Sequence, residues 1–470
     1  MPGQNTYFLI SLAKHLNLCA KYSHQLAFDY VARVTSRNLL DGTVMIRVQI
    51  NLLDMDQILF TRALQSGVCG IARGFRPASL MGLIAMAQTV TAEEPAFEYG
   101  EISGVFEQAG ERDGYVNFGR IGDSYDRYAA WKDQLRENYG FSFLIEDRMI
   151  NQWSHGASIY DNEINLIARQ EVFRNAPGSL SFNIWGQFAN SLGGTTASQF
   201  QTQVGVLSPL NGGNSGPDTS NQILQMFALE YIAPNDRWRV QVGKLALRTL
   251  VNLNRYANGD SEMFFSPMLG NNPVVPYTAT LGLGAFAQWK QDGWYLSGLV
   301  RAPDVELGLS TQSWNAGNRA YVVEAGLTPT IPGLGDGVYR LTWSLDEANA
   351  ATPRMETWSL SADQDIGDQF GAFFRYAQAD TTFRDFRKRA ALGFQVKKPF
   401  GFSYDRLGVG AWWGNPTNLS LNEETGIEVF YKAQISPFME LTPDIQVVLN
   451  PANTTESTRV VFGLRLRIVL

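Results

Sequence analysis

The C-terminal end of the chain alternates apolar and charged side chains with a period of two. Even-numbered positions from Val460 to Leu470 are all apolar, whereas Arg459, Arg465 and Arg467 stand at odd-numbered positions. Because successive side chains of a strand point to opposite faces, one face is apolar and the other carries three arginines. Such a strand suits two settings: a soluble sheet with its apolar face on a core, or a bilayer wall with its apolar face toward lipid.

The same alternation recurs from Phe141 to the C-terminus. It predicts an all-β chain, a transmembrane antiparallel β-barrel of about sixteen strands of roughly ten residues each. The predicted strands are Phe141–Trp153, Ile164–Phe173, Leu180–Phe188, Ile223–Ile232, Trp238–Leu247, Leu281–Trp289, Trp294–Arg301, Tyr321–Leu327, Val338–Leu345, Glu356–Asp365, Phe370–Gln378, Arg389–Lys397, Asp405–Trp413, Gly426–Ile435, Met439–Leu449 and Thr458–Leu470.

Short turns and long loops alternate between these strands. Pro177-Gly178 and Ser436-Pro437 are short turns, whereas Ala189–Asn221 and Arg248–Thr280 are long loops. In a barrel of the outer membrane, the short turns belong on the periplasmic side and the long loops outside. The barrel must close, because an unpaired backbone group in hydrocarbon costs several kcal/mol. At about sixteen strands, the barrel is too wide for side chains to fill and leaves an aqueous channel.

Ahead of the first strand, residues 93–139 form a predicted periplasmic leader with a helix at residues 124–138. Ser124 can cap this helix, Tyr128 and Trp131 recur at helical spacing, and Gly140 ends it. Two settings remain open for the helix: the protein surface, or a plug-like position at or inside the periplasmic mouth. The barrel itself occupies residues 140–470.

The first ninety or so residues show no strand pattern of this kind. Residues 73–92 contain a basic segment, a short apolar segment and a small-residue cleavage site, which predicts a secretory signal cut after Ala92. A signal should begin just before its basic segment, so residues 1–72 are expected to reflect a mis-assigned start, with the true start at Met45 or Met55 and the residues upstream of it not made. A genuine N-terminal extension is the alternative.

The C-terminal part also carries a family resemblance. Glu428–Lys432 (EVFYK), Leu441–Gln446 (LTPDIQ), Asn450-Pro451 and Gly463–Arg467 (GLRLR) resemble the C-terminal signature of the OprB-type carbohydrate-selective porins. Val242–Leu245 with Asn254–Asn258 is similar to that family's loop after an early strand. The resemblance implies a barrel over roughly Ser124–Leu470, a helix just ahead of its first strand, and a preference for carbohydrates.

The loop at residues 248–280 is the candidate selective element, because a sugar site needs bidentate donors, oxygen acceptors and aromatic platforms. Its candidate residues are Arg248, Asn254, Arg255, Tyr256, Asp260 and Glu262. The candidates on the lumen face of the wall are Arg375, Glu428, Lys432, Arg465 and Arg467. The alternatives are an ordinary external loop and hydrated wall charges. Clustered arginines could instead favour anions.

Other functions find little support in the sequence. Both cysteines precede residue 92 and only His155 lies in the body, so we expect neither a metal site nor a cofactor there. A net charge of −7 argues against nucleic-acid binding. An outer-membrane lipid hydrolase would have to use His155 beside Ser154 or Ser158, and a soluble all-β binding protein is a further alternative.

We therefore predict a non-enzymatic porin of the outer membrane. It passively conducts small hydrophilic solutes, with carbohydrates as the first hypothesis and an anion-selective or general porin as the alternative. The expected partners are sugars or similar solutes, outer-membrane lipid and the barrel-insertion machinery, and a homo-oligomer is compatible with the sequence, which shows no legible interface.

Overall fold

The computed structural model describes residues 33–38, 44–49, 114–116, 118–175, 178–213, 220–259, 261–270, 272–275, 281–302, 307–348, 353–380 and 384–470. The chain divides into two compact units, Met1–Phe75 and Arg76–Leu470. The described part of the first unit is an antiparallel hairpin of β1 (Arg33–Asn38) and β2 (Val44–Gln49). The predicted signal at residues 73–92, including its cleavage site, lies outside the described residues.

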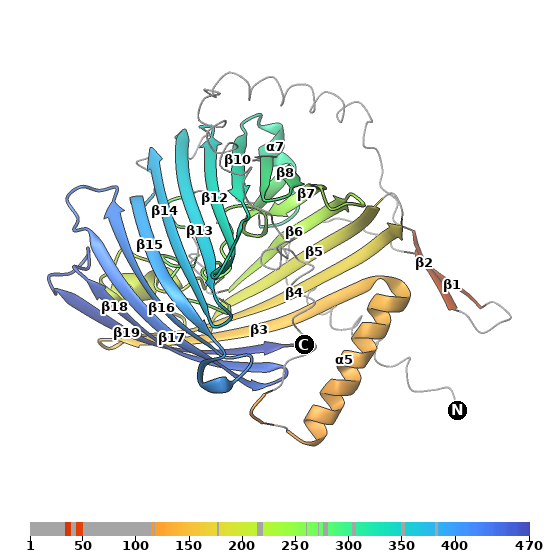
Figure 1. The fold of residues 1–470 in the computed structure, drawn as a ribbon, viewed down its shortest axis with the longest axis horizontal. Helices are drawn as coiled ribbons and strands as arrows, with labels where there is room; N and C mark the ends of the chain where they lie inside the picture. The colour runs from red at the N-terminus through yellow and green to blue at the C-terminus, as the bar shows by residue number, and fades with distance from the viewer. Residues whose placement is uncertain are drawn as a thin grey trace, which may run out of the picture. The chain divides into compact units, whose positions relative to one another are not determined.

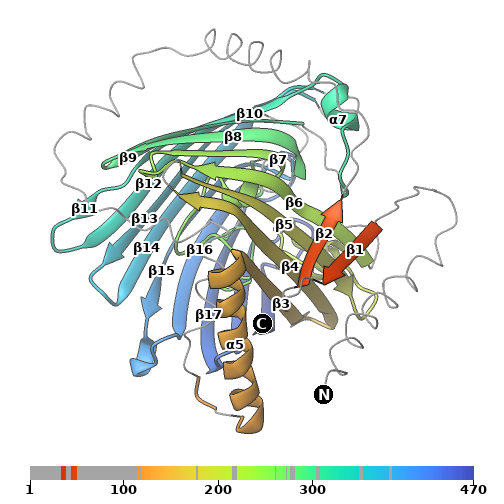
Figure 2. The same ribbon diagram turned by 90° about the vertical axis from the view of Figure 1, so that its right-hand side faces the viewer.

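The second unit is a closed antiparallel barrel (Figures 1 and 2). It has sixteen strands, because β10 and β11 both pair with β12 and form one interrupted strand. Strand β19 pairs with β3 and closes the ring. The strands are β3 (Phe141–Ser154), β4 (Ala157–Asn175), β5 (Gly178–Ser191), β6 (Ser220–Ile232), β7 (Trp238–Ala246), β8 (Leu281–Gln291), β9 (Trp294–Arg301), β10 (Ala320–Leu327), β11 (Thr330–Ile331), β12 (Gly335–Asp346), β13 (Met355–Ile366), β14 (Phe370–Asp380), β15 (Phe386–Lys397), β16 (Arg406–Pro416), β17 (Glu424–Ser436), β18 (Met439–Leu449) and β19 (Thr458–Val469).

Side chains alternate between the two faces of the wall as the sequence predicts. On β19, Arg465 and Val461 are buried inside the barrel at 1% and 0% exposure, whereas Phe462 and Leu464 are 43% and 39% exposed on the outer face. The apolar rows therefore cover the outside of the barrel, where they can face lipid, and do not pack against one another in a solid core.

The two ends of the barrel differ in their connections. One end, called the turn end below, carries the start of β3, the end of β19 and short connections such as residues 176–177 and 437–438. The opposite loop end carries the long connections, including residues 192–219 and 247–280. This is broadly the predicted alternation, although β3 and β4 are joined at the loop end by the two-residue turn His155-Gly156.

The predicted helix before the first strand is α5 (Arg120–Tyr139), and it begins four residues earlier than expected. The predicted cap was wrong: Gly119 holds the N-cap position, and the Ser124 hydroxyl donates to the carbonyl of Arg120 inside the first turn. Gly140 ends the helix in a left-handed conformation, as predicted. Among the described residues, no helix is long and apolar enough to cross a membrane.

Helix α5 lies at the rim of the turn end. Its Tyr128 and Trp131 rings pack on Phe143 of β3, and Tyr125 packs on Phe438 in the turn between β17 and β18. Phe143 alternates with buried Leu144, so its side chain is on the outer face of the wall. These contacts place the helix at the mouth and on the outer side of its rim, rather than inside the lumen.

Candidate functional site

The connection between β7 and β8 folds into the barrel. Its described residues contact the inner faces of widely separated strands of the ring, from Glu324 of β10 to Arg465 of β19. A segment that reaches strands so far apart in a closed barrel must lie inside it. The sequence left an ordinary external loop open as the alternative to a selective element, and these contacts support an inward arrangement.

Two arginines of the wall hold this loop through its backbone. Arg375 of β14 donates to the carbonyl oxygens of Ala257 and Gly270 and, at 2.7 Å, to that of Asn252. Arg389 of β15 donates to two successive carbonyls of the loop around residue 268. Both guanidinium groups are buried, so the loop carbonyls replace the water that would otherwise solvate them.

The opposite side of the loop is held by a carboxylate. Glu428 of β17 accepts hydrogen bonds from the backbone N–H groups of Phe265 and Ser266, the latter at 3.0 Å. Beside it, Arg465 of β19 donates to the carbonyl of Met263 at 3.0 Å. Wall charges of both signs therefore fix the path of the loop without using its side chains.

Arg255 lies in a network of charges near the turn end. Its guanidinium contacts the carboxylates of Asp363 and Asp365, the second at 2.8 Å, and Lys397 contacts Asp365 at 2.6 Å. Tyr256 donates its hydroxyl to Asp365 as well. Burial, together with this hydrogen bond, raises the pKa of Tyr256 above its usual value, so the hydroxyl stays a neutral donor.

A second network surrounds Arg467 of β19. It contacts Glu146 of β3, Glu440 of β18 at 3.0 Å and Glu262 of the loop at 2.8 Å. Lys432 lies 3.5 Å from Glu440 and joins the same network. The predicted wall residues Lys432 and Arg467 and the predicted loop residue Glu262 therefore meet in space.

The remaining predicted residues are distributed along the loop. Arg248 lies over the Trp185 ring of β5, with its guanidinium carbon 4.4 Å from the ring centroid. Asn254 donates its amide to the Ser361 hydroxyl at 3.2 Å and to the Ala362 carbonyl. Asp260 lies outside the described residues.

A second loop that the sequence analysis did not select also folds inward. Residues 192–213 contain α6 (Ala197–Val204), which Thr196 caps. Glu424 of β17 accepts the N–H groups of Leu207 and Ser208 at 2.7 and 2.8 Å, while Gln446 of β18 donates to the Leu210 carbonyl. Glu424 lies four residues before Glu428, so one strand carries the carboxylates that hold both loops.

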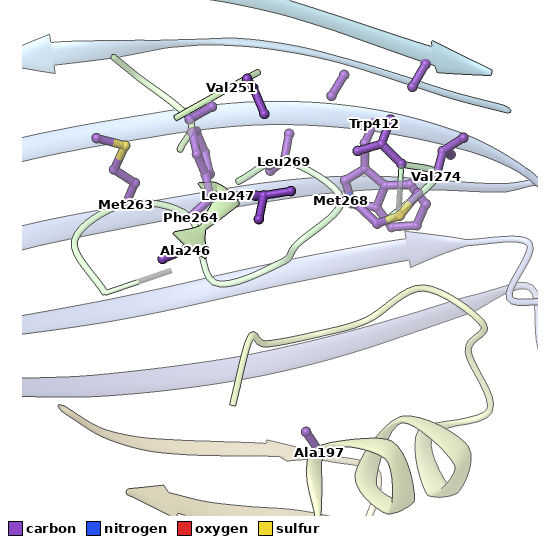
Figure 3. Close-up of a cluster of buried hydrophobic side chains, with 14 of the residues drawn as sticks. Ala197, Ala246, Leu247, Val251, Met263, Phe264, Met268, Leu269, Val274 and Trp412 are labelled. Atoms are coloured by element: carbon purple, nitrogen blue, oxygen red, sulfur yellow. The ribbon is translucent and has the colours of Figure 1, made fainter. Parts of the chain in front are cut away.

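An apolar cluster lies where the two loops meet the wall. Phe264, Met268 and Leu269 of the first loop are fully buried in it, together with Trp412 of β16 (Figure 3). One residue indicates this cluster in the sequence: Phe430 stands on the same face of its strand as Glu428 and Lys432. An apolar residue on a lumen face marks a place where a loop covers the wall.

Opposite charges are also paired at other places on the inner wall. Glu230 of β6 lies between Arg239 at 2.6 Å and Arg169 at 3.5 Å, and Arg148 contacts Glu163 at 2.7 Å. Arg255 and Lys397, which keep partial exposure, also have carboxylate partners, whereas Arg248 lies on the Trp185 ring and Arg459 donates to the Val204 carbonyl and the Thr454 hydroxyl. The lumen therefore combines many hydrogen-bonding groups with locally balanced charge.

The hydrolase hypothesis requires His155 to act with Ser154 or Ser158. His155 is exposed in the tight turn between β3 and β4. The hydroxyl of neighbouring Ser154 donates to the carbonyl of Val460 at 2.7 Å rather than to the imidazole. This geometry gives no support to a serine–histidine pair.

A closed sixteen-stranded barrel with an apolar outside, a charged inner wall and inward loops defines a porin-type channel. The family model described as "Carbohydrate-selective porin, OprB family" matches residues 183–470. That match covers more than half of the chain, which therefore belongs to the OprB family of porins. The family and the fold indicate a channel rather than an enzyme, and they imply a location in the outer membrane.

Relatives and solved structures agree with this assignment. Porin AaxA of Chlamydia pneumoniae is 26% identical over 260 residues, which are 50% of this chain and 56% of that protein. Porin AaxA of Chlamydia abortus is 24% identical over 267 residues, 54% of this chain and 59% of that protein. The matched region thus spans less than two thirds of either curated relative. The high-pH structure of Pseudomonas putida OprB covers 77% of this chain and 100% of its own, with a TM-score of 0.62 and 12% identity, and shows the shared fold.

Proposed function

We propose that the channel conducts neutral, multiply hydroxylated solutes, with small carbohydrates as the substrate class. The observation that supports this proposal is the local balance of charge in the lumen. Arg255 is paired with two carboxylates, and Arg467 with three. Where cations such as Arg255 and Lys397 are neutralised within about one hydrogen-bond length, the lumen offers donors and acceptors to a neutral solute and little net attraction to an anion.

The solute pathway, in this proposal, runs past the side chains that the loop contacts leave partly exposed. Arg255 and Glu262 keep 17% and 21% of their side-chain surface, and Lys397 keeps 24%. A passing sugar would exchange hydrogen bonds with these groups one at a time. Each contact must stay weak, because a tight site would slow the flux.

A test of the proposal combines two measurements on the purified channel. In a planar bilayer with a KCl gradient, we expect a reversal potential near zero and a current that dissolved sugars reduce. In liposome swelling, we expect monosaccharides to enter faster than organic anions of similar size. A strongly anion-selective current without block by sugars would reject the carbohydrate assignment in favour of an anion porin.

The variant Glu262→Gln tests whether the charge balance around Arg467 sets the ion selectivity of the channel. It removes one of the three carboxylates around Arg467 and should shift the reversal potential toward anion selectivity while the barrel stays folded. Glu423→Gln, at an exposed position near the loop end, is the matched control and should leave the reversal potential unchanged. Equal behaviour of the two variants would show that the Arg467 network does not border the pathway.

A further inference from the structure

Two carboxyl groups of the inner wall meet at one of the points where the β7–β8 loop is anchored. Glu428 of β17 and Asp444 of β18 lie on the inner faces of neighbouring strands and are 0% and 6% exposed. Their carboxyl groups are within hydrogen-bonding contact of each other. A hydrogen bond between them requires a proton on one group, because two carboxylates offer acceptors only.

The other partners of the two groups assign this proton to Asp444. Glu428 accepts the backbone N–H groups of Phe265 and Ser266, one on each of its oxygens. Asp444 accepts the side-chain amide of Gln446 on Oδ1 at 3.1 Å, whereas its Oδ2 is buried and has no hydrogen-bond donor among the described residues. An Oδ2–H group that donates to Glu428 satisfies both side chains.

The charges around the pair also favour one proton. Arg465 of β19 is the cation that faces Asp444, and its guanidinium carbon lies 4.5 Å from the centroid of the Phe265 ring. The next charges along β17 and β18, Lys432 and Glu440, contact each other. Two carboxylates beside one guanidinium would enclose a net negative charge, which is costly, whereas one shared proton makes the group neutral.

The nearest charges on other elements have partners elsewhere. Glu262 of the β7–β8 loop contacts Arg467, and Glu424 of β17 accepts backbone N–H groups of the second inward loop. The charge of the Glu428–Asp444 pair is therefore determined by its own proton and by Arg465.

We propose that Asp444 is a positioning residue of the channel, a protonated carboxyl group that holds the Glu428 carboxylate against the backbone of the β7–β8 loop. When the proton leaves to water, two enclosed carboxylates repel each other, and Glu428 shifts away from the N–H groups of Phe265 and Ser266. The loop then depends on its remaining anchors, such as Arg375, and its position is less fixed. The width and steadiness of the channel thereby depend on pH.

Single-channel recording across a pH range tests the role of this proton. The range runs from about pH 5 to about pH 10, in which an isolated carboxyl group stays ionised. The wild-type current should be steady at the acidic end and become larger and noisier at the alkaline end, in one step that fits the release of one proton. Asp444→Asn keeps a donor to Glu428 at every pH, so its current should match wild type at the acidic end and lose the step.

Two further variants separate the hydrogen bond from the presence of a carboxyl group. Asp444→Leu has no donor, so its current should be as noisy as that of wild type at the alkaline end and independent of pH. Glu423→Gln removes an exposed carboxylate near the loop end and should keep the wild-type step.

Infrared spectroscopy detects the proton itself. The difference spectrum of wild type minus Asp444→Asn, at neutral pH, should contain the C=O stretching band of a protonated carboxyl group. The absence of this band would overturn the proposal, as would a wild-type current that does not change with pH or a step that persists in Asp444→Asn. These measurements report on the loop and its anchor rather than on the passing solute, so their outcome is independent of the carbohydrate assignment.

Discussion

The guanidinium of Arg375 is expected to hold the β7–β8 loop against the inner wall, and its replacement by glutamine tests this directly. The group is 1% exposed and donates to three loop carbonyls, those of Asn252, Ala257 and Gly270. Glutamine is too short to reach all three and carries no charge. The variant Arg375→Gln therefore leaves buried carbonyls without donors unless the loop moves away and hydrates them.

The size of the effect follows from the number of bonds. A hydrogen bond to a charged group contributes about 1.5–3 kcal/mol, and an unsatisfied buried partner adds to the loss. Three such bonds make a loss of at least about 4 kcal/mol, even when water recovers part of it. Because about 1.4 kcal/mol corresponds to a tenfold change, the ratio of docked to undocked loop should fall by roughly three orders of magnitude.

Single-channel recording and proteolysis report on the loop by different routes. In a planar bilayer, Arg375→Gln should give a larger mean conductance and stronger current noise than wild type, because the loop no longer holds one position. In detergent, trypsin should cleave after Arg255 in the variant but not in wild type. Arg375→Lys keeps the positive charge but lacks the planar guanidinium. Its conductance, current noise and trypsin cleavage should lie between those of wild type and Arg375→Gln.

The control variant removes a cation from the outside of the same sheet. Lys388→Gln lies on the exposed outer face of β15 at the loop end and should match wild type in conductance, noise and protection. Wild-type conductance and noise in Arg375→Gln, together with a loop that stays protected from trypsin, would contradict this role of Arg375. In that case the loop would be held by its apolar cluster rather than by its carbonyls.

Three further perturbations test other parts of the structure. Gly371→Val should displace Tyr256, because a Cβ atom at Gly371 would lie 1.9 Å from the Tyr256 ring, and denaturant unfolding should show a destabilisation of about 1–3 kcal/mol. The control Gly298→Val, where a Cβ atom would meet open space, should leave the stability unchanged. Glu424→Gln should increase amide hydrogen exchange in residues 205–210 and leave the β7–β8 loop protected, since this carboxylate holds the other loop. Burial over an aromatic ring of β3 lowers the pKa of Lys132 to about 8. The undocked helix therefore binds more protons between pH 8 and the usual pKa of 10.5. Docking of α5 should strengthen as the pH rises through this window and should not change with pH below 8, where Lys132 is protonated in both states, and Lys132→Met should abolish the dependence in helix hydrogen exchange.

The alternation of apolar and polar residues along the sequence was sufficient to predict the barrel. The largest error among the predicted strand boundaries is the start of β4, and its cause is informative. The predicted strand Trp294–Arg301 has the same bounds as β9, whereas β4 begins seven residues before the predicted Ile164. That missed segment contains Asp161 and Glu163 on the inner face and Asn162 on the outer face. A strand that is polar on both faces shows no apolar alternation, so the pattern failed in this segment.

The inward folding of two loops could be predicted only in part. Polar residues in the β7–β8 loop suggested a binding site. They do not show whether the loop lies in the lumen or in bulk solvent, because water solvates polar side chains in both places. The contacts that decide the matter join loop backbone to wall side chains distant in sequence, as in the bond from Phe265 to Glu428. No local pattern encodes such a pairing, although the lumen-facing Phe430 indicates that something covers it.

Anchoring through the loop backbone separates two roles among the predicted site residues. Arg375 and Glu428 are enclosed, and their hydrogen bonds are directed at carbonyl and N–H groups that every loop sequence possesses. The side chains of the loop can therefore change without loss of these anchors, while Arg255 and Glu262 keep surface that a solute could reach. Substitution of an enclosed anchor should change how wide and how steady the channel is. Substitution of an exposed loop residue should change which solutes pass while the conductance stays the same. Measuring conductance and solute selectivity on the same channel distinguishes the two kinds of variant.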